Sequence, residues 1–482
     1  MDKSKVLFLL KTFTKEEFKK FGLFLRSPYF NRENIQIKIY DVMKEYYPDF
    51  NSSLLEKQKI YDILYPGRRY NDGAMRNILS DMLKLAELFL SIERFQSENF
   101  KKNIFLLEEL RERKLKTNFL KQKERTEKII EENIIKDGLY YDRKSELAAL
   151  YARFLRGTQE TFIQRDKVLQ ETSDLITISS LIKLIYYNTD MLSVQSNISN
   201  ITYNLNLAEE IDSFFKNKGK KYLKISYIEG YWLSFKLIQT GDEKYFYLLK
   251  ERLTKYSSEM SMHELKNIFT ILENYCYKKI KDGNQAFVKE QFLIYKQSVE
   301  NRSYESIGFI SSTLFMSIVV IAFEAGEFKW ADKFTKEYIN DVKEDSRSNT
   351  LHFCTALKRY WNNKYEEALK ELSKVTSEEF SFKQNIRSLI LKIYYDLNEV
   401  EPFYSHIDSY KHFINKNKIV HNNIREPINN YILFSKRIFD LKNFPKNNTG
   451  FELKKLKGEI MNTSLLINKT WLLKKTDEVK LK

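Results

Sequence analysis

Apolar residues recur every three or four positions along most of the chain, which is the spacing of one face of an α-helix. Within residues 14–89 this pattern predicts four short helices. The first places Phe18, Phe21 and Phe24 on one face, and the last carries an apolar side from Met75 to Phe89. We therefore expect an N-terminal segment of short helices that pack through these faces.

Capping signals mark where several of these helices begin. Thr14 and Glu17 have the spacing of a capping box, in which each side chain satisfies a free backbone amide of the other. Ser53 and Glu56 form a second predicted box, and either Asn71 or Asp72 is expected to cap the last helix.

A polar stretch follows within residues 100–136. The apolar stripe disappears between Leu120 and Ile129, where charged residues of both signs alternate. A helix without an apolar stripe has little surface to bury, so we expect this one to project into solvent. Oppositely charged side chains one turn apart would support it.

Proline is absent between Pro66 and Pro402, so this long region is free to be helical. Residues typical of turns stand 42, 43, 37 and 35 positions apart, at Gly241, Gly283, Gly326, Asn363 and Asn398. Punctuation at such intervals is typical of stacked helical hairpins.

Two segments carry a family resemblance. Residues 326–331 (Gly-Glu-Phe-Lys-Trp-Ala) and 363–369 (Asn-Lys-Tyr-Glu-Glu-Ala-Leu) resemble the start of the second helix of the tetratricopeptide repeat, and Ala356 stands where that family has a small residue on the first helix. The resemblance covers about 310–375 and implies a right-handed stack of helices. The proline that ends the family's repeat is absent, and Phe380 stands near that place.

This alignment leads to an expectation about packing. Ala331 and Ala368 should be buried where helices cross, and Phe328 and Tyr365 should be largely buried beside them.

A second resemblance lies near the N-terminus. Residues 27–31 (Ser-Pro-Tyr-Phe-Asn), 65–67 (Tyr-Pro-Gly) and 70–71 (Tyr-Asn) resemble a bacterial family of helical-repeat proteins. We attach no activity to it.

The chain has 482 residues, of which 43% are hydrophobic, so it can bury a sizeable core. We expect an all-α protein with a small helical domain at 1–95, a tetratricopeptide-like α-solenoid at 96–440 and a helical tail at 441–482. Two cysteines without paired spacing indicate a reducing compartment. The longest apolar run, 313–323, is too short to span a bilayer, which needs about 20 residues. A cytoplasmic protein without a membrane segment is the expectation.

The formal net charge is +16. It has two interpretations. A basic surface for anionic partners is one. The other, which we favour, is a drift in amino-acid composition that has no functional role, because lysine far exceeds arginine while Asn, Ile, Tyr and Phe are abundant.

Arg68, Arg69 and Arg76 lie around the expected start of a helix and are candidate contacts for an anion or phosphate. Alternatively, these side chains are solvated or paired with nearby carboxylates, which we prefer.

Several aromatic residues could line a groove for a partner. Neighbours on a helix point about 100° apart, so one ring of each pair should be buried and the other could be exposed. We expect most of these rings to lie in the core. The candidate groove residues are Tyr187, Tyr231, Trp232, Tyr360, Trp361, Tyr394 and Tyr395.

None of the nucleotide, metal or nucleophile motifs sought occurs in the sequence. We expect no enzyme activity and no cofactor. The predicted function is a protein-interaction scaffold that binds a protein or peptide. The alternative is a nucleic-acid-associated regulator that binds phosphates through the basic N-terminal domain.

Overall fold

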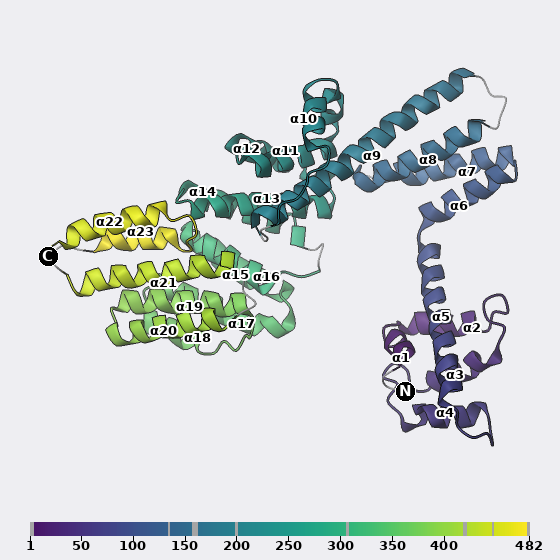
Figure 1. The fold of residues 1–482 in the computed structure, drawn as a ribbon, viewed down its shortest axis with the longest axis horizontal. Helices are drawn as coiled ribbons and strands as arrows, with labels where there is room; N and C mark the ends of the chain where they lie inside the picture. The colour runs from purple at the N-terminus through teal and green to yellow at the C-terminus, as the bar shows by residue number, and fades with distance from the viewer. Residues whose placement is uncertain are drawn as a thin grey trace. The chain divides into compact units, whose positions relative to one another are not determined.

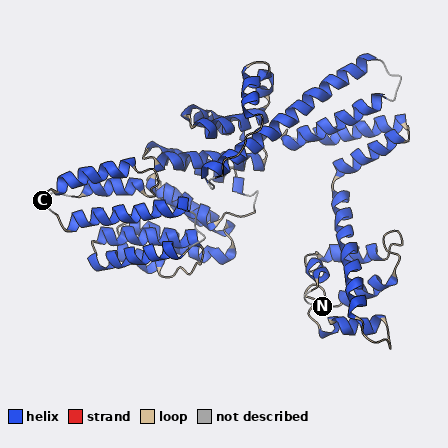
Figure 2. Cartoon of the chain, viewed as in Figure 1, coloured by secondary structure: helices blue, strands red, loops and turns tan. Residues whose placement is uncertain are grey.

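The computed structural model describes residues 4–133, 135–156, 162–197, 201–304, 308–417, 422–445 and 448–479. These residues form α-helices joined by short turns (Figures 1 and 2). Within them the β structure is limited to a single isolated bridge between Ile310 and Val342. The predicted all-α fold is therefore confirmed.

The chain divides into two compact units. The first comprises Met1–Glu132 and Glu146–Val168, and the second comprises Asn133–Ser145 and Leu169–Lys482. The predicted segments 1–95, 96–440 and 441–482 are not separated by this division and stay predictions. Two helices contribute to both units, namely α8 (Gly138–Arg156) and α9 (Phe162–Asn197).

The first unit packs its N-terminal helices around a cluster of phenylalanines. The rings of Phe13, Phe21 and Phe24 all lie within 6 Å of the ring of Phe89. The helices of this unit are α1 (Lys5–Leu10), α2 (Lys15–Leu25), α3 (Asn34–Lys44), α4 (Lys57–Leu64), α5 (Asp72–Ser97), α6 (Asn99–Glu112) and α7 (Lys116–Glu131).

The capping predictions have mixed outcomes. The Thr14 box is confirmed, because the Thr14 hydroxyl accepts from the Glu17 amide at 3.2 Å and the Glu17 carboxylate accepts from the Thr14 amide at 2.7 Å. The Asn71 side chain caps α5 by accepting from the Ala74 amide at 3.0 Å. The predicted box at Ser53 is wrong. Residues Ser53–Leu55 form a 3-10 turn capped by the preceding serine, and α4 begins only at Lys57.

The predicted single helix that projects into solvent is also wrong. Lys114 has a φ of +60°, which ends α6 and turns the chain back into α7. One face of α7 is buried although it carries the polar residues Gln122 and Thr126, because both side chains find partners. Gln122 donates to the Asn103 side chain at 3.0 Å, and Thr126 donates to the Gln122 carbonyl at 2.8 Å. A buried polar group that is hydrogen-bonded costs little.

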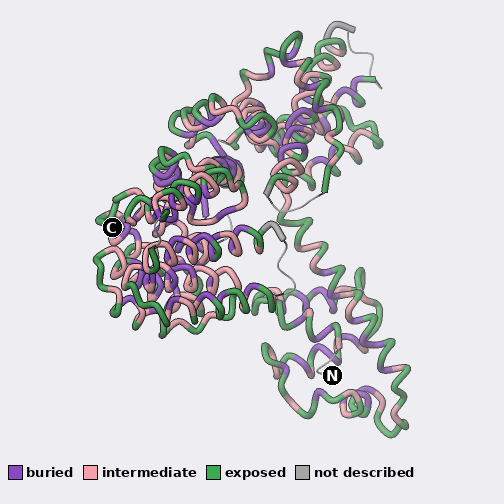
Figure 3. The backbone as a smooth tube through the Cα atoms, turned by 60° about the vertical axis from the view of Figure 1, so that its left-hand side comes forward, coloured by how far each residue is buried: buried purple, intermediate pink, exposed green. Residues whose placement is uncertain are grey.

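The second unit is an array of helical hairpins. Along most of its helices buried residues alternate with exposed ones (Figure 3), whereas every residue of the central helix α15 is buried or partly buried. Its helices are α10 (Ala208–Lys216), α11 (Ser226–Thr240), α12 (Glu243–Tyr256), α13 (Met262–Lys281), α14 (Ala286–Glu300), α15 (Ser312–Glu324), α16 (Phe328–Tyr338), α17 (Glu344–Trp361), α18 (Tyr365–Leu372), α19 (Phe380–Leu397), α20 (Val400–Lys416), α21 (Asn422–Asn443), α22 (Thr449–Asn462) and α23 (Lys469–Glu478).

Five hairpins turn at the five predicted positions. The backbone is left-handed at each, with φ of +65° at Gly241, +97° at Gly283, +79° at Gly326, +59° at Asn363 and +60° at Asn398. Glycine and asparagine adopt this conformation more readily than other residues, which is why they end helices so often. Each position lies at or just beyond the end of the first helix of a hairpin, from α11–α12 to α19–α20.

The repeat alignment predicted the small residues correctly and one ring incorrectly. Ala331 and Ala368 are fully buried. Phe328 is 44% exposed, and Tyr365 is half-buried. Both rings stand on the first residue of their helix, so they cover the hairpin turn from outside. Phe328 packs edge-on against Phe323 at 5.5 Å and against Trp361 at 5.8 Å, and the rest of its ring is exposed.

The first prediction concerns the alanine in α18. Ala368→Leu should reduce the free energy of unfolding by about 1–3 kcal/mol, because three added carbon atoms have no space at a filled helix crossing. Urea denaturation of both proteins measures this change. Lys370→Leu on the exposed face of the same helix is the matched control and should change stability by less than about 0.5 kcal/mol. Equal unfolding midpoints for Ala368→Leu and the wild type would show that this crossing is not tightly packed.

Candidate functional site

The C-terminal helix α23 is held by the hairpin array. It packs against α13, α21 and α22. Its Trp471 is only 9% exposed, and Leu472 is fully buried. A segment that lies almost 190 residues after the end of α13 (469−281) therefore completes the packing of the array.

Trp471 sits among tyrosines from three helices. Its ring meets Tyr395 of α19 edge-on at 5.2 Å and Tyr431 of α21 at 6.0 Å. Its indole Nε1 donates to the Tyr360 Oη of α17 at 3.3 Å. Edge-to-face geometry suits aromatic rings, and a buried indole N–H needs an acceptor. The site thus matches both the shape and the polarity of tryptophan.

A charge-assisted network lies one helical turn further along α23. The Lys475 Nζ is 2.6 Å from the Asp396 Oδ1 and 2.7 Å from the Glu478 Oε2. Asp396 also accepts from the Tyr360 hydroxyl at 2.8 Å. The side chains of Lys475 and Asp396 are 11% and 10% exposed, so both ions are largely removed from water.

The electrostatics follow from this burial. Burial opposes the charged ammonium of Lys475, but its bonds to Asp396 and Glu478 outweigh that effect and raise the pKa of the lysine. Burial also raises the pKa of the Tyr360 hydroxyl, and the neighbouring Asp396 carboxylate raises it further. The tyrosine therefore stays a neutral donor while the lysine stays charged.

The predicted groove aromatics do not form one continuous ladder. Tyr360 and Tyr395 come together around Trp471. Trp361 instead packs against Phe323 and Phe328. The remaining candidates lie elsewhere along the unit: Tyr231 is buried, Trp232 and Tyr394 are half-buried, and Tyr187 is 62% exposed.

Sequence reasoning missed Trp471, Asp396 and Lys475 as parts of this site. One signal was present, because Trp471 and Lys475 are four positions apart and so share one face of a helix. Lys475 pairs with Asp396 of α19, 79 positions earlier (475−396), and Trp471 donates to Tyr360 of α17, so no local pattern connects α23 with its partners.

The candidate arginines lie on and beside the start of α5. Arg76 pairs with Asp72, with its Nε 3.0 Å from the carboxylate Oδ2. The Arg68 guanidinium lies over the Tyr65 ring at 5.7 Å, and Arg69 is exposed. The Asn71 side chain occupies one free amide of the helix N-terminus, and Asp72 places a negative charge in its first turn. Both weaken the attraction of this N-terminus for an external anion.

A second buried ionic cluster joins α11 and α12. The Arg252 Nη1 donates to Glu229 at 2.8 Å, and its Nη2 lies 2.6 Å from the Ser226 hydroxyl. Gly230 makes room for it, because a Cβ there would approach the arginine Nε to 2.8 Å. Burial raises the pKa of the nearby Glu264 to about 8, although Arg252 opposes the shift. The cluster fixes two helices to each other.

Two further observations concern the described part of the chain. No group of three or more His, Cys, Asp or Glu side chains among those residues could hold a metal ion. None of their helices is both long and apolar enough to cross a bilayer.

Comparison with protein-family models, with curated proteins and with solved structures finds no match for this chain.

The second prediction tests the site formed by Tyr360, Tyr395 and Asp396, which holds Trp471 and Lys475 and is called the seat of α23. Trp471→Ala should reduce the local stability of residues 469–478 by about 3–5 kcal/mol, because the ring leaves a cavity and Tyr360 loses a partner. Hydrogen exchange of this segment, followed by mass spectrometry, measures the change. Lys474→Ala, whose side chain is 67% exposed on the same helix, is the control and should leave exchange nearly unchanged. Equal exchange in the tryptophan variant and the wild type would show that α23 is held by other contacts.

The third prediction concerns the half-buried carboxyl of Glu273 on α13. Burial raises its pKa from 4.5 to about 8. The folded state therefore binds the proton more tightly than the unfolded state, so this group's contribution to stability is complete below pH 4.5 and is lost as the pH rises towards 8. The loss amounts to at most about 1.4 kcal/mol per unit of pKa difference.

Glu273→Gln cannot ionise and should lack this loss. Urea unfolding across the pH range should show that the free energy of unfolding of the variant rises relative to that of the wild type between about pH 4.5 and pH 8. Glu300→Gln, at a side chain 60% exposed on α14, is the control and should track the wild type. Parallel curves for Glu273→Gln and the wild type would contradict the prediction.

Proposed function

We propose that the chain is a non-catalytic protein-interaction scaffold and that the tetratricopeptide-like hairpin array of the second unit is its binding surface. The observation that carries the proposal is the seat of α23. The array binds this ten-residue helix through an aromatic side chain and a lysine one turn later. Stacked hairpins present extended concave surfaces suited to such ligands.

The chemistry of the seat indicates what kind of partner the array accepts. Tyr360 and Tyr395 offer ring edges and a hydroxyl acceptor, and Asp396 offers a buried carboxylate. A helix that presents a tryptophan and a cation at this spacing satisfies all three at once. A helical segment of another protein is therefore the ligand class that we propose.

We also propose a cytoplasmic location. Cys276 and Cys354 are both unpaired and buried. Burial raises the pKa of the Cys354 thiol to about 12, which keeps it protonated. Thiols in this state suit a reducing compartment.

One observation favours the alternative, a regulator that binds nucleic acid. Arg68 and Arg69 are exposed on the turn before α5, and neither has an ion pair with a carboxylate of the described residues. A phosphate backbone could use both guanidiniums.

One experiment separates the two functions. The tagged chain and its Arg68→Ala/Arg69→Ala/Arg76→Ala variant are purified from their source cells, each with and without nuclease, and every captured protein is then combined with the purified chain. The scaffold predicts a protein that binds both forms equally, resists nuclease and protects α13–α21 from hydrogen exchange. If the captured proteins are lost both after nuclease treatment and in the triple variant, the chain binds nucleic acid, and the scaffold function is contradicted.

A further inference from the structure

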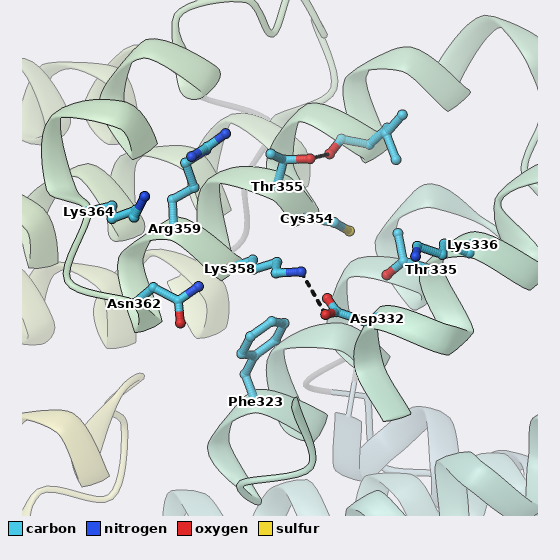
Figure 4. A pocket seen from close by; sticks show the side chains of 11 residues that line it. Phe323, Asp332, Thr335, Lys336, Cys354, Thr355, Lys358, Arg359, Asn362 and Lys364 are labelled. Carbon is cyan, nitrogen blue, oxygen red and sulfur yellow. Dashed lines mark hydrogen bonds and ion pairs between the residues drawn. The ribbon is translucent and has the colours of Figure 1, made fainter. Parts of the chain in front are cut away.

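A separate pocket lies between α16 and α17, on consecutive hairpins of the second unit (Figure 4). It has a volume of about 370 Å³. Its apolar part is formed by the exposed Leu351 and by the buried Phe323 and Cys354. Leu351 is 44% exposed, so a large aliphatic side chain faces the pocket without a covering group. Apolar surface of this kind gains free energy when a ligand covers it.

The pocket is distinct from the seat of α23. Lys358, which lines the pocket, and Tyr360, which contacts Trp471, are two positions apart on α17. Two positions correspond to about 200° around a helix, so the two side chains leave α17 on nearly opposite faces. A ligand in the pocket therefore does not compete with α23.

Cations surround the apolar part. Lys336 comes from α16, whereas Lys358, Arg359 and Lys364 come from the end of α17 and the turn after it. Asp332 is the one carboxylate among the residues described as lining the pocket. Cationic side chains thus outnumber anionic ones four to one along the wall.

The neighbouring carboxylates neutralise only part of this charge. Lys358 extends to Asp332 with a distance of 2.6 Å between Nζ and Oδ2, as Figure 4 shows. Arg359 and Lys364 share Glu367, which stands outside the pocket. Lys336 has no ion pair with any residue that the structure describes. Two carboxylates, one of them outside the pocket, therefore pair with three of the four cations, and an excess of positive charge remains.

We infer that this pocket binds an anionic group joined to an apolar group about as large as one amino-acid side chain. The apolar part would cover the exposed Leu351, and the anion would lie among the lysines. Lys358 can serve both charges, because an ammonium has three donors and Asp332 uses one of them. The volume is near the lower end for ligand pockets, which favours a ligand of this modest size over a nucleotide.

Two sources could supply this chemistry, a free carboxylic acid or an acidic, aromatic segment of a protein. Both present the same anionic and apolar groups to the pocket, whether or not the chain is a scaffold.

The test uses the full chain and three probes in isothermal titration calorimetry. N-acetylphenylalanine carries the apolar group and the carboxylate, N-acetylphenylalanine amide carries the same ring without the charge, and acetyl-Asp-Phe-Asp-amide presents the ring within an acidic peptide. We expect one binding site and an affinity for each anionic probe at least about tenfold above that of the neutral amide, with a loss at high salt. The tighter of the two anionic probes identifies the source.

Variants locate the binding. Lys336→Gln/Lys358→Gln should weaken the anionic probes by about 2- to 25-fold, since each partly exposed charge contributes about 0.2–1 kcal/mol. Leu351→Asn should weaken the acid and the amide alike, because it alters the apolar part. Lys333→Gln is the matched control, because this side chain is 71% exposed and stands on α16, as Lys336 does, but lies outside the pocket. It should leave the affinities for the acid and for the amide unchanged. Equal affinity for acid and amide, an unaffected double variant, or no binding of any probe would each overturn the inference.

Discussion

A helical hairpin cannot bury its own apolar surface, and this constraint governs the second unit. Each hairpin covers part of its core internally and leaves the rest for the next one. Stacking therefore requires that consecutive hairpins turn at corresponding places and approach closely. The left-handed residues from Gly241 to Asn398 meet the first requirement, and the fully buried Ala331 and Ala368 meet the second. The core clusters run from one hairpin into the next for the same reason; one cluster alone extends from Phe292 to Ile393.

The same constraint explains why α23 is seated so firmly. Asp396, near the end of α19, is only 10% exposed where α23 packs. A buried carboxylate without a cation is costly, and removing one partner of such a pair typically costs about 3–5 kcal/mol. Lys475 supplies the cation and Tyr360 supplies a hydrogen bond, so the three side chains depend on one another. The aromatic contacts of Trp471 then add apolar burial without a further unpaired polar group.

The sequence was most informative where one residue type has one conformational consequence. Gly326 and Asn363 could be placed at hairpin turns because few other residues adopt positive φ easily, and Thr14 could be placed as a cap because its box is local. The errors arose where tertiary partners decide. Gln122 on α7 is buried because Asn103 lies opposite it, and Phe328 is exposed because its helix begins there. The seat of α23 brings together residues that are far apart in the chain, and the pocket between α16 and α17 draws its residues from two consecutive hairpins, so periodicity alone could not assemble either.

The net charge of +16 takes on a different meaning once positions are known. Drift in composition would distribute lysines over the surface, where many would pair with a carboxylate one turn away, as Lys333 pairs with Glu337 and Lys216 with Asp212. Such pairs contribute little and attract no ligand. The pocket between α16 and α17 differs because its cations come from two helices and a turn and converge around exposed apolar surface. Convergence, rather than total charge, distinguishes a binding site from a basic composition. The interpretation of the charge as compositional can therefore hold for most of the chain while this pocket still selects an anion.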